Sequence, residues 1–213
     1  MSVSNVYFDF DDVVTDLYTV VKEAVRFIHN FDAPPTLNLY QLNEQEEYGG
    51  SIDHGDIPIV DSDVYKIIYT VMTGNVNLLP MLKDADDFFD SFIIKSAYKP
   101  IGRFVFKGLT ARNPLLSGVI DDWMRVNLKD RVPYKVLHAS GNQGGTSNSK
   151  PEVLKELKAT HYVEDQYCVA SKIVDSGIPV FLLDKPYNQG FPEREGITRI
   201  ENLCDIKKHI KLN

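Results

Sequence analysis

The chain has 213 residues, of which 43% are hydrophobic and 25% are charged, a balance typical of a globular protein with a sizeable core. Its formal net charge of -7 at pH 7 argues against a long nucleic acid or an anionic membrane surface as partner, because such partners favour a basic surface. The length suits one medium domain or a core domain with a small lid, and no apolar run approaches a membrane span.

The first part of the chain predicts one strand followed by helices and loops. Residues 6–8 form a short apolar run that ends in acids, which predicts a buried strand. Apolar residues recur every three or four positions across residues 17–29, which predicts an amphipathic helix. Residues 31–62 are polar, acidic and interrupted by Pro and Gly, so they predict loops, whereas residues 64–71 and 85–94 predict helices.

After Pro100 the pattern changes to strands that alternate with helices. The predicted strands are short apolar runs at residues 104–110, 135–139, 161–163, 180–183 and 197–200. Pro114 suits the first position of a helix, and Ser149 suits the N-cap of another, after a glycine-rich loop. This alternation predicts an α/β fold in which helices cover both faces of a Rossmann-like parallel sheet.

The segment between the first strand and Pro100 breaks the alternation and is interpreted as an insertion. We therefore predict a core of residues 1–14 and 101–213, with a small, mainly helical cap of residues 15–100. The cap is expected to lie over the carboxyl ends of the strands, where open α/β sheets bind ligands.

The first predicted strand ends in the acidic sequence Asp9-Phe10-Asp11-Asp12. Residues two apart in a strand face the same side, so Asp9 and Asp11 should project together. Two carboxylates so close repel each other unless a cation or a shared proton relieves them, and Mg²⁺ favours such oxygens. One carboxylate could then be a nucleophile and the other a proton donor and acceptor; a solvated acidic turn is the alternative.

Other strand and helix ends complete a pattern. Thr110 ends a predicted strand, Lys150 opens a predicted helix, and Glu164 and Asp165 end a later strand. Together with the segment that starts at Asp9, these positions resemble, in the same order, the four motifs of the haloacid-dehalogenase (HAD) superfamily. The resemblance covers the chain from residue 6 to residue 190 and implies a HAD-like core and a Mg²⁺-dependent phosphohydrolase.

The resemblance implies roles for the four acids. Asp9 would be the nucleophile and a metal ligand. Asp11 would be the acid/base, and its backbone carbonyl would bind the metal. Glu164 and Asp165 would complete the Mg²⁺ site; Glu164 stands where Asp is commoner, so which of the two touches the metal directly is open.

The resemblance also implies a phosphate site. Thr110 would hold phosphate oxygens through its hydroxyl and nearby backbone N–H groups, and Ala111 and Arg112 would also bind the substrate. Lys150 would neutralise the charge that develops on the transferring phosphoryl group, so Thr110 and Lys150 count as catalytic residues. Lys155 and Lys158 are alternatives, but they lie later in the helix, away from its anion-binding end.

Lys150 also carries an expectation about stability. A lysine in the first turn of a helix opposes the helix dipole, so it is a poor choice for stability alone. We therefore expect Lys150→Ala to leave stability unchanged or raised by about a few tenths of a kcal/mol.

Within the superfamily, residues 181–188, which end in Pro186-Tyr187-Asn188, resemble the loop of 5′-nucleotidase-like members, including relatives of the pyrimidine 5′(3′)-deoxyribonucleotidases. Residues 110–112, Trp123 and residues 197–200 fit the same members. The resemblance therefore implies a nucleoside or deoxynucleoside monophosphate as the small phosphorylated substrate. A turn selected for backbone geometry is the alternative for Tyr187 and its neighbours.

Other functions stay open: a phosphatase for another small phosphomonoester or for a nucleic-acid 3′-phosphate, or a catalytically silent HAD-fold scaffold used for binding. The scaffold would be expected to lose Asp9 or Asp11, and both are present. The oligomeric state, homo-oligomers included, is also open.

Several features have plainer interpretations. Aromatic residues of the cap could stack on a base, but most are expected to form the cap's own core. The loop at residues 141–149 fits neither GxGxxG nor the Walker A spacing, and His138 is expected to be a core histidine. Cys168 and Cys204 form no CxxC pair; with an N-terminus unlike a signal peptide, they predict a reduced, cytoplasmic protein.

Overall fold

The computed structural model describes residues 4–39, 61–73, 79–92, 104–112, 117–128, 131–139 and 150–212. Its strands are β1 (Val6–Phe8), β2 (Phe106–Thr110), β3 (Tyr134–His138), β4 (His161–Glu164), β5 (Val180–Leu183) and β6 (Ile197–Ile200). Its helices are α1 (Leu17–His29), α2 (Asp61–Thr73), α3 (Lys83–Asp90), α4 (Ser117–Leu128), α5 (Lys150–Glu156), α6 (Tyr167–Asp175) and α7 (Ile206–His209), with the 3-10 turns η5 (Pro186–Asn188) and η6 (Leu203–Asp205). Within these ranges, no helix combines the length and apolar character that a membrane crossing needs.

The strands form one parallel sheet in the order β3-β2-β1-β4-β5-β6. The register aligns Phe8 of β1 with Gly108 of β2 on one side and with Val163 of β4 on the other. The strand order reverses between β1 and β4, which is the kind of switch point where open α/β sheets bind ligands. The predicted α/β class with a Rossmann-like parallel sheet is confirmed.

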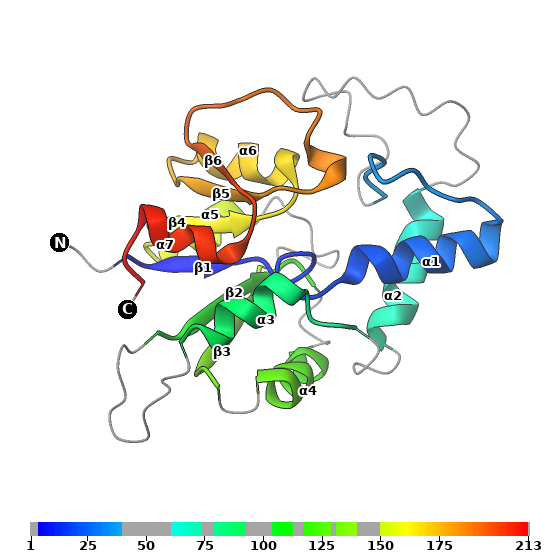
Figure 1. The fold of residues 1–213 in the computed structure, drawn as a ribbon, viewed down its shortest axis with the longest axis horizontal. Coiled ribbons are helices and arrows are strands. Elements are labelled where there is room, and N and C mark those ends of the chain that lie inside the picture. Colours follow the sequence, from blue (N-terminus) through cyan, green and yellow to red (C-terminus); the bar gives the residue numbers. More distant parts are fainter. Residues whose placement is uncertain are drawn as a thin grey trace.

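Hydrophobic cores lie on both faces of the sheet, because alternate strand residues point to opposite faces. On one face, Phe8 and Phe181 pack with apolar residues of α3, α4 and α7. On the other face, Tyr162 and Leu182 pack with residues of α5 and α6. Figure 1 shows α3 and α7 on the near side of the sheet and α6 behind it, so helices cover both faces as predicted.

The start of β2 differs from the prediction. β2 begins at Phe106, because its pairing with β3 begins there, at Tyr134. Phe104, predicted to be in the strand, instead stacks on Phe92 with ring centroids 4.1 Å apart. The predictions for residues 40–60, Pro114 and the loop at residues 141–149 lie outside the described residues.

α1 and α2 pack together beyond the carboxyl end of β1 (Figure 1). The segments that enter and leave this part of the chain lie side by side. The Asp16 N–H donates to the Pro80 carbonyl at 2.9 Å, and the Leu82 N–H donates to the Val14 carbonyl at 2.9 Å. These paired linkers connect the α1–α2 region to the sheet.

α3 lies within the range predicted for the cap, but it packs on the sheet. The Phe88 ring lies 5.7 Å from the Phe8 ring, and the Phe89 ring lies 5.3 Å from the Phe106 ring. These two aromatic residues therefore belong to the core of the sheet rather than to a core of the cap. The division at residues 15–100 stays a prediction, and we propose a narrower cap between the paired linkers, from residue 16 to residue 80.

Candidate active site

Three acidic side chains meet where the strand order reverses. Asp9 follows β1, Glu164 ends β4 and Asp165 follows it. The Asp9 N–H donates to the Val163 carbonyl at 2.8 Å, which extends the pairing of the two strands beyond Phe8. One carboxylate oxygen of each acid lies within 4.8 Å of the others, and all three residues are buried. The structure thus places side by side three of the acids that were predicted to bind the metal.

Lys150, the first residue of α5, lies between two of these acids. Its Nζ is 3.0 Å from Asp9 Oδ2 and 3.0 Å from Glu164 Oε2, and only 3% of its side chain is exposed. Burial opposes the charge of Lys150, but Asp9 and Glu164 outweigh burial and raise the pKa of Lys150 well above its ordinary value. The expectation that Lys150→Ala spares stability loses its basis here, because that change would leave two buried carboxylates without their cation.

Burial disfavours the charged form of all three acids. It raises the pKa of Asp9 to about 8, and the charge of Glu164 adds to the effect. It raises the pKa of Asp165 to about 8, together with the charges of Asp12 and Asp9. Burial also raises the pKa of Glu164 to about 7, against the opposing charge of Lys150. One lysine is therefore too little positive charge to keep the three carboxylates ionised near neutral pH.

The chemistry of these acids fits Mg²⁺. Asp165 Oδ1 is fully buried and has no hydrogen-bond partner among the residues that the structure describes. A buried carboxylate oxygen without a partner is costly, and a hard cation that prefers carboxylate oxygens would satisfy it. Asp9, Glu164 and Asp165 are the residues that would hold the ion. Asp11 was the fourth predicted ligand, through its backbone carbonyl. Its carboxylate is not part of this group in the described structure.

Asp11 instead pairs with Arg112. Arg112 Nε donates to Asp11 Oδ2 at 2.9 Å, and Arg112 Nη2 donates to Asp11 Oδ1, so both carboxylate oxygens are engaged. The guanidinium also lies over the Phe10 ring, 5.0 Å from its centroid. Arg112 was predicted to bind substrate, but no sequence pattern indicates its pairing with Asp11, which spans 101 positions of the chain.

The end of β2 forms a compact turn beside this pair. Thr110 is fully buried, and its Oγ1 accepts a hydrogen bond from the Arg112 N–H at 3.1 Å. Ala111 is partly exposed between them. His138 Nδ1, at the end of β3, lies 3.1 Å from the Arg112 carbonyl oxygen, so this half-buried histidine supports the turn.

Asp12, the last acid of the first motif, helps to cap a helix. It has a φ of 55°, in the left-handed region, and its Oδ1 accepts a hydrogen bond from the Tyr18 N–H at 2.7 Å. This bond satisfies a backbone donor in the first turn of α1. Asp12 thus links the end of β1 to the helix that follows.

A further residue, Tyr187 of η5, touches the acid cluster directly. Its hydroxyl donates to Asp165 Oδ2 at 2.7 Å, and Tyr187 is buried. Next to it, Asn188 Nδ2 donates to the Asp165 carbonyl at 2.6 Å and to the Leu183 carbonyl at 2.8 Å. The Pro-Tyr-Asn sequence was interpreted as a sign of a nucleotide substrate. In the structure, Tyr187 and Asn188 contact Asp165, a candidate metal ligand.

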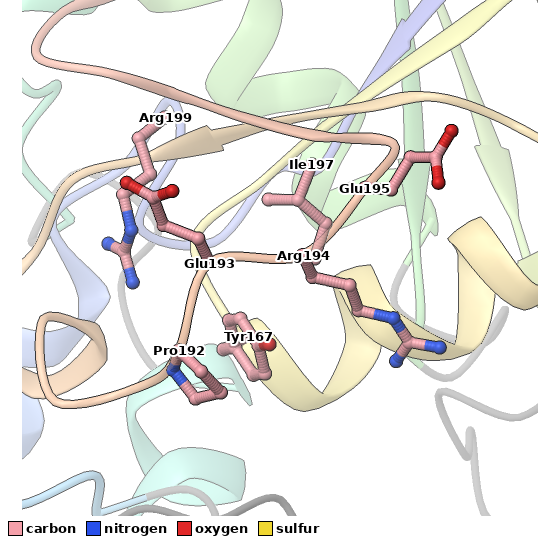
Figure 2. A pocket seen from close by; sticks show the side chains of 7 residues that line it. All are labelled: Tyr167, Pro192, Glu193, Arg194, Glu195, Ile197 and Arg199. Carbon is pink, nitrogen blue, oxygen red and sulfur yellow. The ribbon is translucent and has the colours of Figure 1, made fainter.

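A separate hollow of about 480 Å³ lies along the segment that leads into β6, and Tyr167 and Arg199 are among its lining residues. Figure 2 shows Arg194 and Arg199 pointing away from each other there. Both cations are already paired, Arg194 with Asp175 and Arg199 with Asp184. None of the clustered acids lines this hollow.

Comparison with known proteins identifies the fold. No family model and no curated protein matches the chain. Among solved structures, a Lactobacillus plantarum protein described as a phosphoglycolate phosphatase is similar with a TM-score of 0.56 and 12% identity, over 98% of this chain and 99% of that chain. A haloacid dehalogenase-like hydrolase from Streptococcus pneumoniae has a TM-score of 0.54 and 10% identity, over 97% of this chain and 98% of that chain.

An L-2-haloacid dehalogenase is also similar, with a TM-score of 0.51 and 12% identity, over 97% of this chain and 99% of that chain. Identities this low bear on the architecture and not on the reaction. The chain therefore has the α/β fold of haloacid dehalogenase-like hydrolases.

Proposed function

We propose that this chain is a Mg²⁺-dependent phosphomonoester hydrolase that acts through an aspartyl-phosphate at Asp9. The observation that carries the proposal is the buried cluster of Asp9, Glu164 and Asp165 with Lys150, at the switch point of the sheet. Three carboxylates and one lysine leave the cluster short of positive charge. A divalent cation would supply that charge and would allow an anionic substrate to bind beside the acids.

In the first step, an Asp9 carboxylate oxygen attacks phosphorus, and the bond between phosphorus and the leaving oxygen breaks. Asp11 gives its proton to that oxygen, so the leaving group departs as an alcohol. Lys150 and the buried turn at Thr110 stabilise the charge on the phosphoryl oxygens. Mg²⁺, when bound, would offset the charges of the carboxylates and of the phosphate.

In the second step, water attacks the phosphorus of the aspartyl-phosphate and gives a proton to Asp11. The bond between phosphorus and the Asp9 oxygen breaks, which releases phosphate and restores Asp9. Arg112 holds both oxygens of Asp11 in the structure. Protonation of either oxygen lowers the negative charge of Asp11 and therefore weakens its pairing with Arg112.

For the substrate, we propose a nucleoside or deoxynucleoside monophosphate. The support is the resemblance of the segment around Tyr187 to 5′-nucleotidase-like proteins; the contact of Tyr187 with Asp165 puts this segment beside the acid cluster. Another small phosphomonoester is the second candidate, because the similar Lactobacillus plantarum protein is described as acting on phosphoglycolate. A nucleic-acid 3′-phosphate remains the third, and the acidic net charge disfavours it.

The test is phosphate release from a panel of small phosphomonoesters that includes nucleoside 5′- and 3′-monophosphates and phosphoglycolate. We expect hydrolysis with Mg²⁺ and none with EDTA, and the highest kcat/KM for a nucleotide. Hydrolysis that persists without divalent metal would contradict the mechanism. Highest activity on phosphoglycolate would agree with the proposed mechanism but would contradict a nucleotide as the preferred substrate.

Two outcomes would replace the proposal. The fold is shared with an L-2-haloacid dehalogenase, so halide release from a 2-haloacid without metal would assign the chain to that reaction. No turnover of any compound, with tight binding of one of them, would favour the silent scaffold.

A further inference from the structure

We propose that Tyr187 is a positioning residue of the metal site: its hydroxyl holds one oxygen of Asp165 so that the other oxygen faces the cation. This inference rests on the proposed function, because it concerns the same Mg²⁺ site. It adds a residue from η5, an element outside the four motif positions.

The proposal rests on the different surroundings of the two carboxylate oxygens of Asp165. Oδ2 accepts the hydrogen bond of the Tyr187 hydroxyl at 2.7 Å. Oδ1 is buried and has no hydrogen-bond partner within the described ranges. A carboxylate with one oxygen tied by a buried donor has a fixed orientation, and its other oxygen is left as the ligand. Hydrogen bonds to metal ligands of this kind orient the ligand and tune its affinity.

The surrounding turn keeps Tyr187 in place. Asn188 binds the backbone carbonyls of Asp165 and Leu183, which ties η5 to the ends of β4 and β5. Arg199 of β6 donates to Asn188 Oδ1 at 2.9 Å and to the Asn188 carbonyl at 2.6 Å. Asn188, which follows Tyr187, is thus anchored from β4, β5 and β6, and a positioning group needs such support.

The Tyr187 ring has a second neighbour on α1. Its centroid lies 4.8 Å from that of Tyr18, whose own hydroxyl donates to the Leu37 carbonyl at 2.6 Å. The two tyrosines therefore pack against each other, and their hydroxyls donate to different acceptors, that of Tyr187 to Asp165 and that of Tyr18 to the Leu37 carbonyl. This arrangement supplies a matched control, because Tyr18→Phe removes a similar hydrogen bond from the same aromatic pair and leaves Asp165 untouched.

The experiment is a calorimetric titration of metal-stripped full-length protein with Mg²⁺, without substrate. We expect Tyr187→Phe to weaken Mg²⁺ binding by about 10–100-fold, and Tyr18→Phe to change it by less than about twofold. In kinetics, Tyr187→Phe should raise the Mg²⁺ concentration for half-maximal rate more than it lowers kcat at saturating Mg²⁺. A merely structural role would change melting temperature in both variants and spare the Mg²⁺ affinity of both.

Arg199→Met is the second variant, which keeps the test decisive if Tyr187→Phe folds poorly. It removes the bonds to Asn188 from a partly exposed position and leaves Tyr187 in the chain. We expect a smaller but measurable loss of Mg²⁺ affinity. Wild-type affinity in Tyr187→Phe would overturn the inference alone, as would an equal loss in Tyr18→Phe. If Tyr187→Phe does not fold, wild-type affinity in Arg199→Met would overturn it. Absence of Mg²⁺ binding in the wild-type protein would overturn the proposed function with it.

Discussion

Charge and burial act in opposite directions at Lys150. Its ammonium is 3.0 Å from a carboxylate oxygen of Asp9 and of Glu164, and none of the three side chains is more than 6% exposed. Removing one partner from a buried ion pair leaves an uncompensated charge, which is strongly destabilising. The helix dipole disfavours a cation at an exposed helix start, but the two buried ion pairs of Lys150 outweigh that effect.

We therefore expect Lys150→Ala to lower the free energy of unfolding of the metal-free protein by about 3–5 kcal/mol. The same change should reduce kcat/KM by roughly a hundredfold or more, since it removes a preorganised cation at the phosphoryl group. Urea unfolding in EDTA and steady-state kinetics measure the two effects. Lys155→Ala is the control: Lys155 is exposed on the same helix, and its stability change should stay within about 0.5 kcal/mol. Unchanged stability in Lys150→Ala would show that the pairs do not form.

At the scale of elements, the entry to β6 depends on one glycine. Gly196 has a φ of 86°, and a Cβ there would lie 2.7 Å from Cγ1 of Val174 in α6. Its carbonyl accepts a hydrogen bond from the Val180 N–H at 2.9 Å, so its backbone also starts the pairing of β5 with β6. A side chain at this position would strain the backbone, because φ is positive, and would clash with Val174.

Gly196→Ala should lower the free energy of unfolding by about 1–3 kcal/mol, the scale of one strained backbone position. Gly118 in α4 offers the comparison, because a Cβ there would meet no atom of the described residues within 4 Å, apart from its chain neighbours and the backbone of its own helix. Gly118→Ala should leave stability unchanged or raise it by about 0.5–1 kcal/mol. Thermal or urea unfolding of the two variants measures the difference. Equal effects would mean that the turn at Gly196 is not formed as described.

At the scale of the whole molecule, local patterns predict much of the fold. Strands such as β4 and β5 are short apolar runs that end at acids or turns, and their alternation with helices implies a parallel sheet. The strand order follows from pairing between distant segments, so no local pattern contains it. Phe88 shows the same limit: its helix was predicted, but only the packed structure places its ring against Phe8 instead of in a cap.

The candidate site was also only partly predictable from the sequence. Asp9, Glu164 and Asp165 could be predicted to meet, because the carboxyl ends of parallel strands lie at one edge of the sheet. The partners of Asp11 and Asp165 could not, since Arg112 and Tyr187 reach them across 101 and 22 positions of the chain. Their side-chain directions depend on turns at Thr110 and in η5 whose geometry sequence patterns do not specify.

The central claim is that Asp9 is the nucleophile of a Mg²⁺-dependent phosphohydrolase. The most direct measurement is kcat/KM of wild-type protein and of Asp9→Asn, with Mg²⁺, on the best phosphomonoester of the panel. The account predicts a folded variant whose kcat/KM falls by at least roughly a thousandfold, as expected when a nucleophile is removed. Turnover close to that of the wild type in folded Asp9→Asn would contradict it.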